Sequence, residues 1–235
     1  MEPLKIFIGF DPKETVAYHV LVQSLLEGAS VPLAITPLSL PHLTSVFNRP
    51  RHPLQSTDFS FTRFLTPYLS NYQGVSLYMD CDMIVSTDIK QLFDLACDEY
   101  AVQCVQHQQP ALYGTKFLDQ PQSYYEKKNW SSLMLMNNVK CKALTPDYVN
   151  NATGLDLHQF AWLAHDKLIG SLPPEWNHLV SYQAADPNAK IIHYTAGGPY
   201  FEDYKNCQQA QKWFDKKANM LRVQEKQHVC STATA

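Results

Sequence analysis

Long apolar runs and targeting signals are missing from this sequence. The 235 residues contain no run of about eighteen apolar residues, the length that a membrane-spanning helix requires. The first ten residues lack the charged start, long apolar middle and small-residue cleavage site of a signal peptide. Together these absences predict a cytoplasmic protein with no transmembrane segment.

Paired cysteines and an excess of positive charge are missing as well. None of the six cysteines lies in a Cys-X-X-Cys pair, which argues against a structural zinc site. We expect free thiols, several of them packed in the core, as in a reducing compartment. The formal net charge is −3, so no overall positive field would attract nucleic acid.

Length and composition indicate one globular domain. Hydrophobic residues make up 45% of the chain and charged residues 17%, as in ordinary soluble domains. A chain of 235 residues is long enough for one α/β domain and short for two. We therefore predict a single domain over residues 1–235, in which 201–235 form a C-terminal helical extension.

Apolar segments alternate with helical patterns along the first half of the chain. Strands are expected over residues 4–10, 31–38, 75–85, 100–105, 133–136 and 190–194. Helices are expected over residues 14–26, 61–69, 87–96, 156–165 and 206–227. This alternation predicts an α/β fold with a mostly parallel central sheet flanked by helices, and such sheets bind ligands at the carboxyl ends of their strands.

Two carboxylates interrupt an apolar segment, residues 75–85, which reads VSLYMDCDMIV. A buried carboxylate costs several kcal/mol unless a cation or hydrogen bonds compensate it. On an extended backbone Asp80 and Asp82 point to the same side, where they can hold a divalent metal against a phosphate. Cys81 would then point away and pack in the core. Surface aspartates in a turn are the alternative, which the apolar residues after Asp82 disfavour.

A histidine and two glycines follow the last apolar strand. His193 lies in residues 191–194, and Gly197 and Gly198 come directly after them. A neutral imidazole added to two carboxylates gives mixed nitrogen and oxygen ligation, which favours manganese, with magnesium as an alternative. The glycines would let the backbone approach an anion closely. A histidine satisfied within the core is the other interpretation.

Further candidates are five polar or aromatic side chains. Arg63 lies in an apolar helix, where it would either face a phosphate or form a structural salt bridge. Asp156 is either a helix N-cap or an acceptor for a sugar hydroxyl. At the end of the first strand, Phe10, Asp11 and Tyr18 could contact a base and ribose, although the two aromatic residues could equally belong to the core.

The order of these segments resembles glycosyltransferase family 8, which includes glycogenin and bacterial lipopolysaccharide galactosyltransferases. The likeness covers about residues 4–200. It consists of the segments IFIGFD (6–11), the helix around Arg63, LYMDCD (77–82), SSLML (131–135) and the histidine segment 191–199. The resemblance implies a GT-A (Rossmann-like) fold, a UDP-sugar donor, manganese and retention of configuration.

The same resemblance assigns roles to individual residues. It implies that Asp80, Asp82 and His193 are the metal ligands and that Arg63 binds the donor. Arg63 and Asp156 are the candidates for the catalytic step. The donor-binding set is completed by Ile8, Phe10, Asp11, Tyr18, Cys81, Gly197 and Gly198.

The sequence departs from this family at three places. Trp130-Ser131-Ser132 stands where the family usually has Asn-X-Gly, and the family's Asp-Gln pair is matched at most by Asp156-Leu157. The phosphate motif beginning at His193 lacks its lysine. A non-catalytic protein that binds nucleotide sugars is therefore one alternative function.

A sugar nucleotidyltransferase is the other alternative, but it needs a glycine-rich, basic loop after the first strand. Residues 10–14, FDPKE, make a poor cradle for a triphosphate. The acceptor in a transfer reaction could be a glycan, a lipid or a small molecule. The basic C-terminal helix either contacts a membrane surface or covers the sheet.

Overall fold

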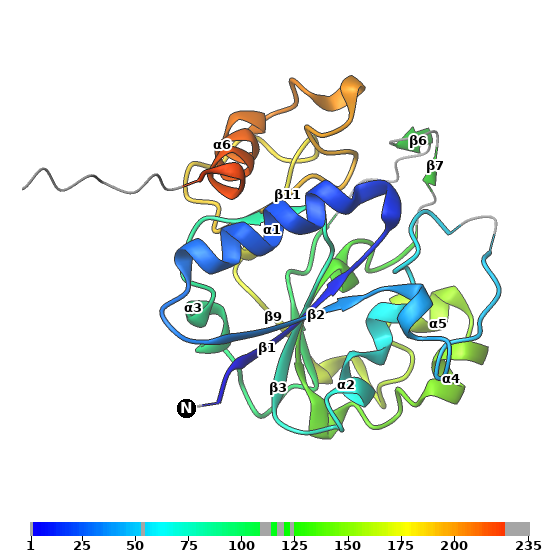
Figure 1. The fold of residues 1–235 in the computed structure, drawn as a ribbon. Coiled ribbons are helices and arrows are strands. Elements are labelled where there is room, and N and C mark those ends of the chain that lie inside the picture. The colour runs from blue at the N-terminus through cyan, green and yellow to red at the C-terminus, as the bar shows by residue number, and fades with distance from the viewer. Residues whose placement is uncertain (1, 53–54, 109–113, 117–119, 123–124, 224–235) are drawn as a thin grey trace, which may run out of the picture.

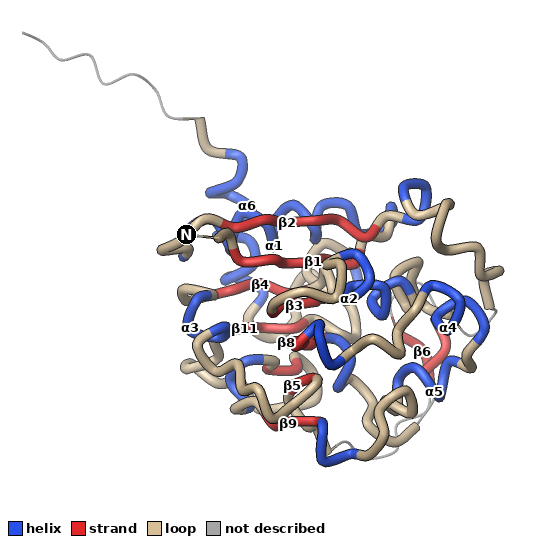
Figure 2. The backbone as a smooth tube through the Cα atoms, turned by 90° about the horizontal axis from the view of Figure 1, so that it is seen from below, coloured by secondary structure: helices blue, strands red, loops and turns tan. Residues whose placement is uncertain are grey.

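The structure is a computed structural model, and it describes residues 2–52, 55–108, 114–116, 120–122 and 125–223. Its centre is a six-stranded sheet (Figures 1 and 2). In spatial order the strands are β2 (Leu33–Leu38), β1 (Leu4–Gly9), β3 (Val75–Met79), β8 (Leu133–Asn137), β5 (Val102–Cys104) and β9 (Ile169–Ser171). β8 runs antiparallel to both of its neighbours, and the other pairings are parallel. The mostly parallel sheet predicted from the sequence is therefore confirmed.

A second, three-stranded sheet lies beside the first. Its strands, in spatial order, are β10 (His178–Leu179), β11 (Ile191–His193) and β4 (Met83–Val85). The single strand expected over residues 75–85 is therefore wrong, because the chain leaves the large sheet at Asp80 and enters the small one at Met83. A separate hairpin joins β6 (Gly114–Lys116) to β7 (Gln120–Gln122).

The alternation of side chains along the strands builds two apolar layers. Alternate residues of β1, β3 and β8 point to opposite faces of the sheet. One layer contains Phe7, Tyr78, Met134 and Met136. The other contains Ile6, Ile8, Leu77, Met79, Leu133 and Leu135. Both faces of the sheet are therefore buried, which explains why these strands read as continuous apolar runs.

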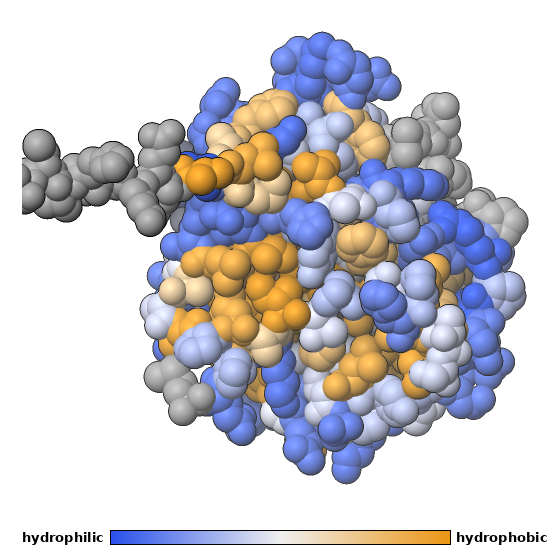
Figure 3. Space-filling view, in the orientation of Figure 1, coloured by the Kyte–Doolittle hydropathy of each residue, from blue (hydrophilic) through white to orange (hydrophobic). Residues whose placement is uncertain are grey.

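Helices cover both faces of the large sheet. α1 (Thr15–Gly28) buries Leu21 and Leu25 against one layer, and α6 (Ala210–Leu221) packs on α1 (Figure 1). The other layer is covered by the segment before α2 (Thr66–Leu69) and by α4 (Pro146–Asn151) and α5 (Gly154–His158). A short helix, α3 (Lys90–Phe93), follows β4. The space-filling view shows apolar surface beneath α1 on the side of β1 and β2 (Figure 3).

Several helices are shorter than the sequence patterns predict. The helix expected over 156–165 ends at His158, because Phe160 takes a left-handed conformation with φ of 60°. The helix expected over 206–227 begins only after Gln209, whose φ is 61°. The segment 61–69 is a 3-10 turn followed by α2, with Pro67 in the first turn of α2, where a missing N–H costs nothing.

The C-terminal helix covers another helix and turns its apolar side inward. Trp213 on α6 is only 1% exposed, and Lys216 forms an ion pair with Glu27 on α1. Within the described ranges, no helix is both long and apolar enough to cross a bilayer. Residues 224–235 of the expected extension lie outside the described part of the chain.

Candidate functional site

The two aspartates lie where the chain passes from one sheet to the other. Asp80 follows β3 directly, and Asp82 precedes β4. The backbone is held at both sheets, since Asp80 N donates to Ser132 O at 2.9 Å and Tyr194 N donates to Asp82 O at 2.9 Å. The antiparallel pairing of β11 with β4 sets His193 opposite Met83, next to Asp82. Residues far apart in the sequence thus meet at the seam between the sheets.

Asp80, Asp82 and His193 form the cluster that the sequence predicts. One ligand atom from each residue lies within 4.8 Å of the others. His193 Nε2 is 3.2 Å from Asp82 Oδ1, and His193 is only 1% exposed. Carboxylate oxygens and an imidazole nitrogen suit a divalent ion such as manganese. The buried Nε2 makes no hydrogen bond with the described residues, as expected for a nitrogen that coordinates a metal.

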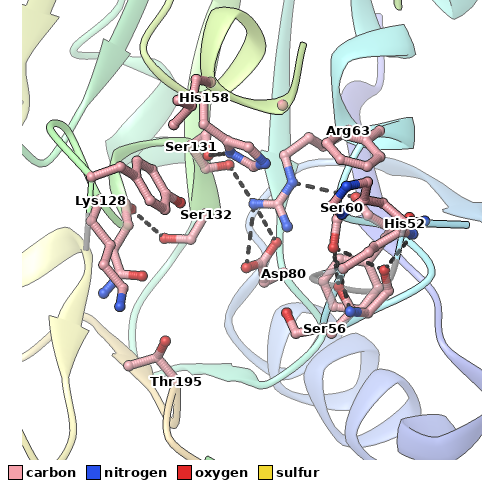
Figure 4. Close-up of a pocket in the computed structure, with 18 of the residues that line it drawn as sticks. His52, Ser56, Ser60, Arg63, Asp80, Lys128, Ser131, Ser132, His158 and Thr195 are labelled. Atoms are coloured by element: carbon pink, nitrogen blue, oxygen red, sulfur yellow. Dashed lines mark hydrogen bonds and ion pairs between the residues drawn. The ribbon is translucent and has the colours of Figure 1, made fainter. Parts of the chain in front are cut away.

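Arg63 forms an ion pair with Asp80. The two groups are 3.1 Å apart, and their side chains are 7% and 13% exposed. Arg63 also donates to Ser131 O at 2.9 Å (Figure 4). Its guanidinium lies over the ring of Tyr78. Tyr78 in turn donates its hydroxyl to Asp80 Oδ1 at 2.7 Å. The structure thus shows the salt bridge that the sequence left open as an alternative role of Arg63.

The charges around Asp80 do not balance within the cluster. Burial and the nearby Asp82 raise the pKa of Asp80, although the charge of Arg63 acts in the opposite direction. The guanidinium of Arg63 interacts electrostatically with both carboxylates. A divalent cation between them would add positive charge to a place where two buried carboxylates lie close together, and this supports the metal-binding hypothesis.

A cavity of about 340 Å³ opens over this cluster. Arg63, Asp80 and Asp82 lie in its wall, and hydroxyl groups of Ser131, Ser132 and Thr195 line it as well (Figure 4). Its described charged residues are two carboxylates, Asp80 and Asp82, and three cations, Arg49, Arg63 and Lys128. A small cavity whose described charged residues give a slight excess of positive charge suits an anionic ligand such as a diphosphate group.

His158 is a wall residue that the sequence did not single out. Its Nδ1 lies 2.7 Å from the hydroxyl of Ser131, and rings of Phe64 and Tyr125 surround it. Burial lowers the pKa of His158 to about 3, and the charges of Arg63 and Arg49 add to this effect. The imidazole is therefore neutral at physiological pH. Its only signal in the sequence was its place near Asp156.

Asp156 supports the start of a helix and does not line the described part of the cavity. Its carboxylate accepts from Thr153 N at 3.1 Å and from the Thr153 hydroxyl at 2.6 Å. Asp156 N donates back to Thr153 Oγ1 at 3.0 Å, which completes a capping box. The N-cap of this helix is therefore Thr153 and not Asp156, as the sequence suggested. Asp156 occupies the third helical position and completes the capping box from there.

The end of β1 lies outside the described lining of the cavity. Ile8 is fully buried in the core, and Phe10 meets Tyr18 edge to face at 5.4 Å. Asp11 accepts the backbone N–H groups of Lys13 at 2.9 Å and of Asp58 at 3.0 Å. The interpretation of Phe10 and Tyr18 as packing residues fits these contacts, and their role toward a base or ribose stays a prediction.

Cys81 and the two glycines have packing contacts. Cys81 is fully buried, and burial raises the pKa of its thiol far above the ordinary value. Gly197 has a φ of 141°, and a Cβ there would lie 2.7 Å from the ring of Tyr204. A Cβ at Gly198 would collide with Tyr200. Glycine at these two positions lets tyrosine rings cover the chain after β11.

Comparison with known proteins places the chain in a family. No protein-family model matches the sequence. Protein CDI from Arabidopsis thaliana is 43% identical over 224 residues, which cover 92% of this chain and 86% of that protein. The chain belongs to the family of Protein CDI.

Solved structures that resemble this member of the Protein CDI family are glycosyltransferases. The bifunctional enzyme WbbM aligns over 92% of this chain with a TM-score of 0.63 and 15% identity. GlyE from Streptococcus pneumoniae aligns over 92% with a TM-score of 0.61 and 15% identity. The chain spans 50% of the WbbM chain and 60% of the GlyE chain.

The galactosyltransferase LgtC, solved with donor and acceptor sugar analogues, has a similar length. It aligns over 94% of this chain and 98% of its own, with a TM-score of 0.58 and 12% identity. At such low identities the likeness concerns the fold. The predicted GT-A fold is therefore confirmed.

Proposed function

We propose that this protein is a metal-dependent glycosyltransferase that moves a sugar from a nucleotide-sugar donor, UDP-linked and with retention of configuration, to an acceptor hydroxyl. The observation that supports this most strongly is the group of Asp80, Asp82 and His193, whose two aspartates lie in the wall of a cavity, within a fold shared with glycosyltransferases. The acceptor could be a glycan, a lipid or a small molecule.

The cluster is suited to holding the diphosphate of the donor. Asp80, Asp82 and His193 would hold manganese, or magnesium in its place, and the bound ion would stabilise the charge that develops on the leaving nucleotide. Arg63 keeps Asp80 ionised and in place, through a contact of 3.1 Å. The hydroxyl group of Thr195 can donate to a phosphate or sugar oxygen from the surrounding wall.

One wall of the cavity would help to orient the sugar. Neutral His158 and the ring of Tyr125 form one side of the cavity, so the sugar end would meet groups that hold their protonation state. Only stabilisation that is stronger in the transition state than in the ground state speeds the reaction. We therefore expect loss of the aspartates to lower turnover more than acceptor binding.

One observation favours a second candidate, a nucleotide-sugar-binding protein without turnover. Asp80 and Asp82 are the only carboxylates in the described lining of the cavity, and Asp156 lies outside it. A reaction that required a separate carboxylate nucleophile would find none there. A nucleotidyltransferase is less compatible, because the β1–α1 connection carries buried Asp11 and Glu14 where a triphosphate would need basic groups.

The test combines ligand binding with a turnover assay. Thermal unfolding would be measured with a panel of nucleotides and nucleotide sugars, each with and without manganese. We expect a manganese-dependent rise in Tm with UDP or a UDP-sugar, and release of UDP when a suitable sugar is offered. Asp94→Ala, at an exposed carboxylate directly after α3, is the control for Asp80→Ala/Asp82→Ala.

The outcomes separate the candidates. Binding without any UDP release would favour the second candidate. A preference for nucleoside triphosphates, or a response that does not require metal, would contradict the glycosyltransferase proposal. A double variant that kept full transfer activity would exclude the metal cluster as the centre of the reaction.

A further inference from the structure

A buried line of hydrogen bonds lies behind His193. His193 Nδ1 is 2.9 Å from Asn177 Oδ1, and Asn177 Nδ2 donates to Ser132 Oγ at 3.0 Å. Ser132 Oγ donates to the backbone carbonyl of Asn129 at 2.7 Å. Asn177 is 0% exposed and His193 is 1% exposed. The contact between Asn177 and His193 is therefore shielded from bulk water.

The last acceptor fixes the direction of the whole line. A backbone carbonyl can only accept, so the single hydroxyl proton of Ser132 points to Asn129. The Ser132 oxygen then accepts from Asn177, and this requires the amide nitrogen of Asn177 to face it. The amide oxygen consequently faces His193, which must donate from Nδ1. The neutral imidazole thus carries its proton on Nδ1 and a lone pair on Nε2.

That lone pair lies in the candidate metal cluster. His193 Nε2 is 3.2 Å from Asp82 Oδ1. The other neutral tautomer would place the proton on Nε2, which would then donate to Asp82 Oδ1. Neither Nε2 nor that oxygen would then be available to an ion. Asn177 competes with Asp82 for the single imidazole proton, and its contact is the shorter of the two.

Local structure holds Asn177 firmly at this position. It follows a 3-10 turn, Pro174–Trp176, whose Trp176 is buried, and it precedes β10, which pairs with β11. Ser132 precedes β8, and its carbonyl also accepts from Asp80 N at 2.9 Å. One serine therefore supports the backbone of one candidate ligand and, through Asn177, the imidazole of another.

We propose that Asn177 is a positioning residue that keeps His193 in the Nδ1-protonated tautomer and thereby presents Nε2 to a divalent ion. The proposal rests on the proposed function, in which Asp80, Asp82 and His193 bind that ion. Partners of metal-bound histidines commonly change metal affinity 10- to 100-fold when they are removed. We expect a weakening of about this size when Asn177 loses its amide.

The first experiment reads the tautomer in the metal-free protein. Long-range nitrogen–proton NMR spectra distinguish a protonated Nδ1 from a protonated Nε2, at a pH above the ordinary histidine pKa. The wild type should show the Nδ1-protonated form of His193. Asn177→Leu should shift the population toward the Nε2-protonated form, because only Asp82 then remains as an acceptor.

The second experiment measures manganese affinity by the electron paramagnetic resonance signal of free manganese. Asn177→Leu should bind about 10- to 100-fold more weakly than the wild type. Asn177→Asp should retain most of the affinity, because its carboxylate can still accept from Nδ1. Asn138→Leu removes another fully buried asparagine, one that bonds to Ser76 and Gln73, and should leave affinity unchanged.

Ser132→Ala provides a milder variant if Asn177→Leu does not fold. Without the Ser132 hydroxyl, the side-chain amide of Asn177 can rotate by 180°. His193 should then populate both neutral tautomers, and manganese affinity should fall less than in Asn177→Leu. An Nε2-protonated His193 in the wild type would overturn the proposal. So would unchanged manganese affinity in folded Asn177→Leu, or in Ser132→Ala where that variant stands in its place.

The two experiments also separate this proposal from the proposed function. A wild type that binds no manganese but shows the Nδ1-protonated form would contradict the metal site of the proposed function. It would equally overturn the part of this proposal that concerns ion binding. A wild type that binds manganese with the Nε2-protonated tautomer would leave the metal site standing and overturn only the role of Asn177.

Discussion

Two neighbouring strands of the large sheet end in carboxylates that serve different purposes. β1 and β3 lie side by side and run parallel, and Asp11 and Asp80 follow their carboxyl ends. Asp11 is 2% exposed and accepts two backbone N–H groups. Glu14, close behind it, accepts the hydroxyl of Tyr200 at 2.6 Å. The protein itself supplies these partners.

The carboxylates after β3 meet a different environment. Asp80 and Asp82 lie close to each other and share the charge of Arg63, while His193 approaches from the small sheet. Burial and position at a strand end are the same in both cases, but the partners differ. The difference teaches that two carboxylates at strand ends can have different roles: backbone amides engage Asp11, whereas Asp80 and Asp82 lie together with His193 in an arrangement that suits a divalent ion.

The largest expected effect concerns Arg63, the cation beside Asp80 and Asp82. Arg63→Met should destabilise the protein by about 3–5 kcal/mol, because it leaves largely buried carboxylates without their partner. Chemical denaturation would measure the change. Arg51→Met, which removes an ion pair whose arginine is 45% exposed, should cost less than about 1 kcal/mol. Equal losses of unfolding free energy in the two variants would show that the buried pair has no greater effect on stability than the exposed one.

The next prediction concerns chemistry. Asp80→Ala/Asp82→Ala should lower kcat/KM for sugar transfer at least about 100-fold, which corresponds to about 2.7 kcal/mol of transition-state stabilisation. Steady-state kinetics with saturating manganese would show it. The variant should also lose manganese binding, whereas Asp94→Ala should retain both properties. Retained manganese affinity in the double variant would place the metal elsewhere.

The pH dependence of stability sharpens the description of the cavity wall. Burial lowers the pKa of His158 to about 3, so below the ordinary value of 6.5 the unfolded chain binds a proton that the folded chain does not. The stability contribution is complete above pH 6.5 and is lost as the pH falls toward 3. Each pH unit in that window removes about 1.4 kcal/mol.

His158→Phe provides the measurement, since its ring fits among Phe64 and Tyr125. The unfolding free energy of this variant should fall less steeply between about pH 6 and pH 4. Burial also lowers the pKa of His107, to about 4, so part of the slope should remain. An unchanged slope would show that His158 titrates normally in the folded protein.

The smallest expected effect lies at the end of β1. Asp11→Ala should cost about 1–2 kcal/mol, because the backbone N–H groups of Lys13 and Asp58 lose their acceptor. Manganese affinity should stay unchanged. A calorimetric titration of the variant with manganese would measure the affinity. A change would show that Asp11 is coupled to the site of Asp80 and Asp82.

Local signals predicted much of the fold and the cluster. Apolar runs marked β1, β3 and β8, because strands buried on both faces leave no polar alternation to confuse the pattern. The resemblance to a family predicted that His193 lies near Asp80 and Asp82, although more than a hundred residues separate them in the sequence. The sequence alone would not have done so, since each signal is local and the contact is not.

Other features could not be predicted because their causes are distant contacts. The change of sheet between Asp80 and Asp82 depends on the pairing of β4 with β11. β9 and β10 are too short to give a pattern. Asn177 follows Trp176 in a turn without any motif, and only the positions of Ser132 and His193 reveal what it does.

The seam between the two sheets has a consequence for cooperativity. Asp80 is tied to the large sheet through Ser132, and Asp82 is tied to the small sheet through Tyr194. Any opening motion that separates the sheets therefore also takes the two carboxylates apart. An ion bound between them would oppose that motion, and amide exchange in β4 and β11 should slow when it binds. At the proposed metal site, local unfolding and ion occupancy would thus be linked quantities.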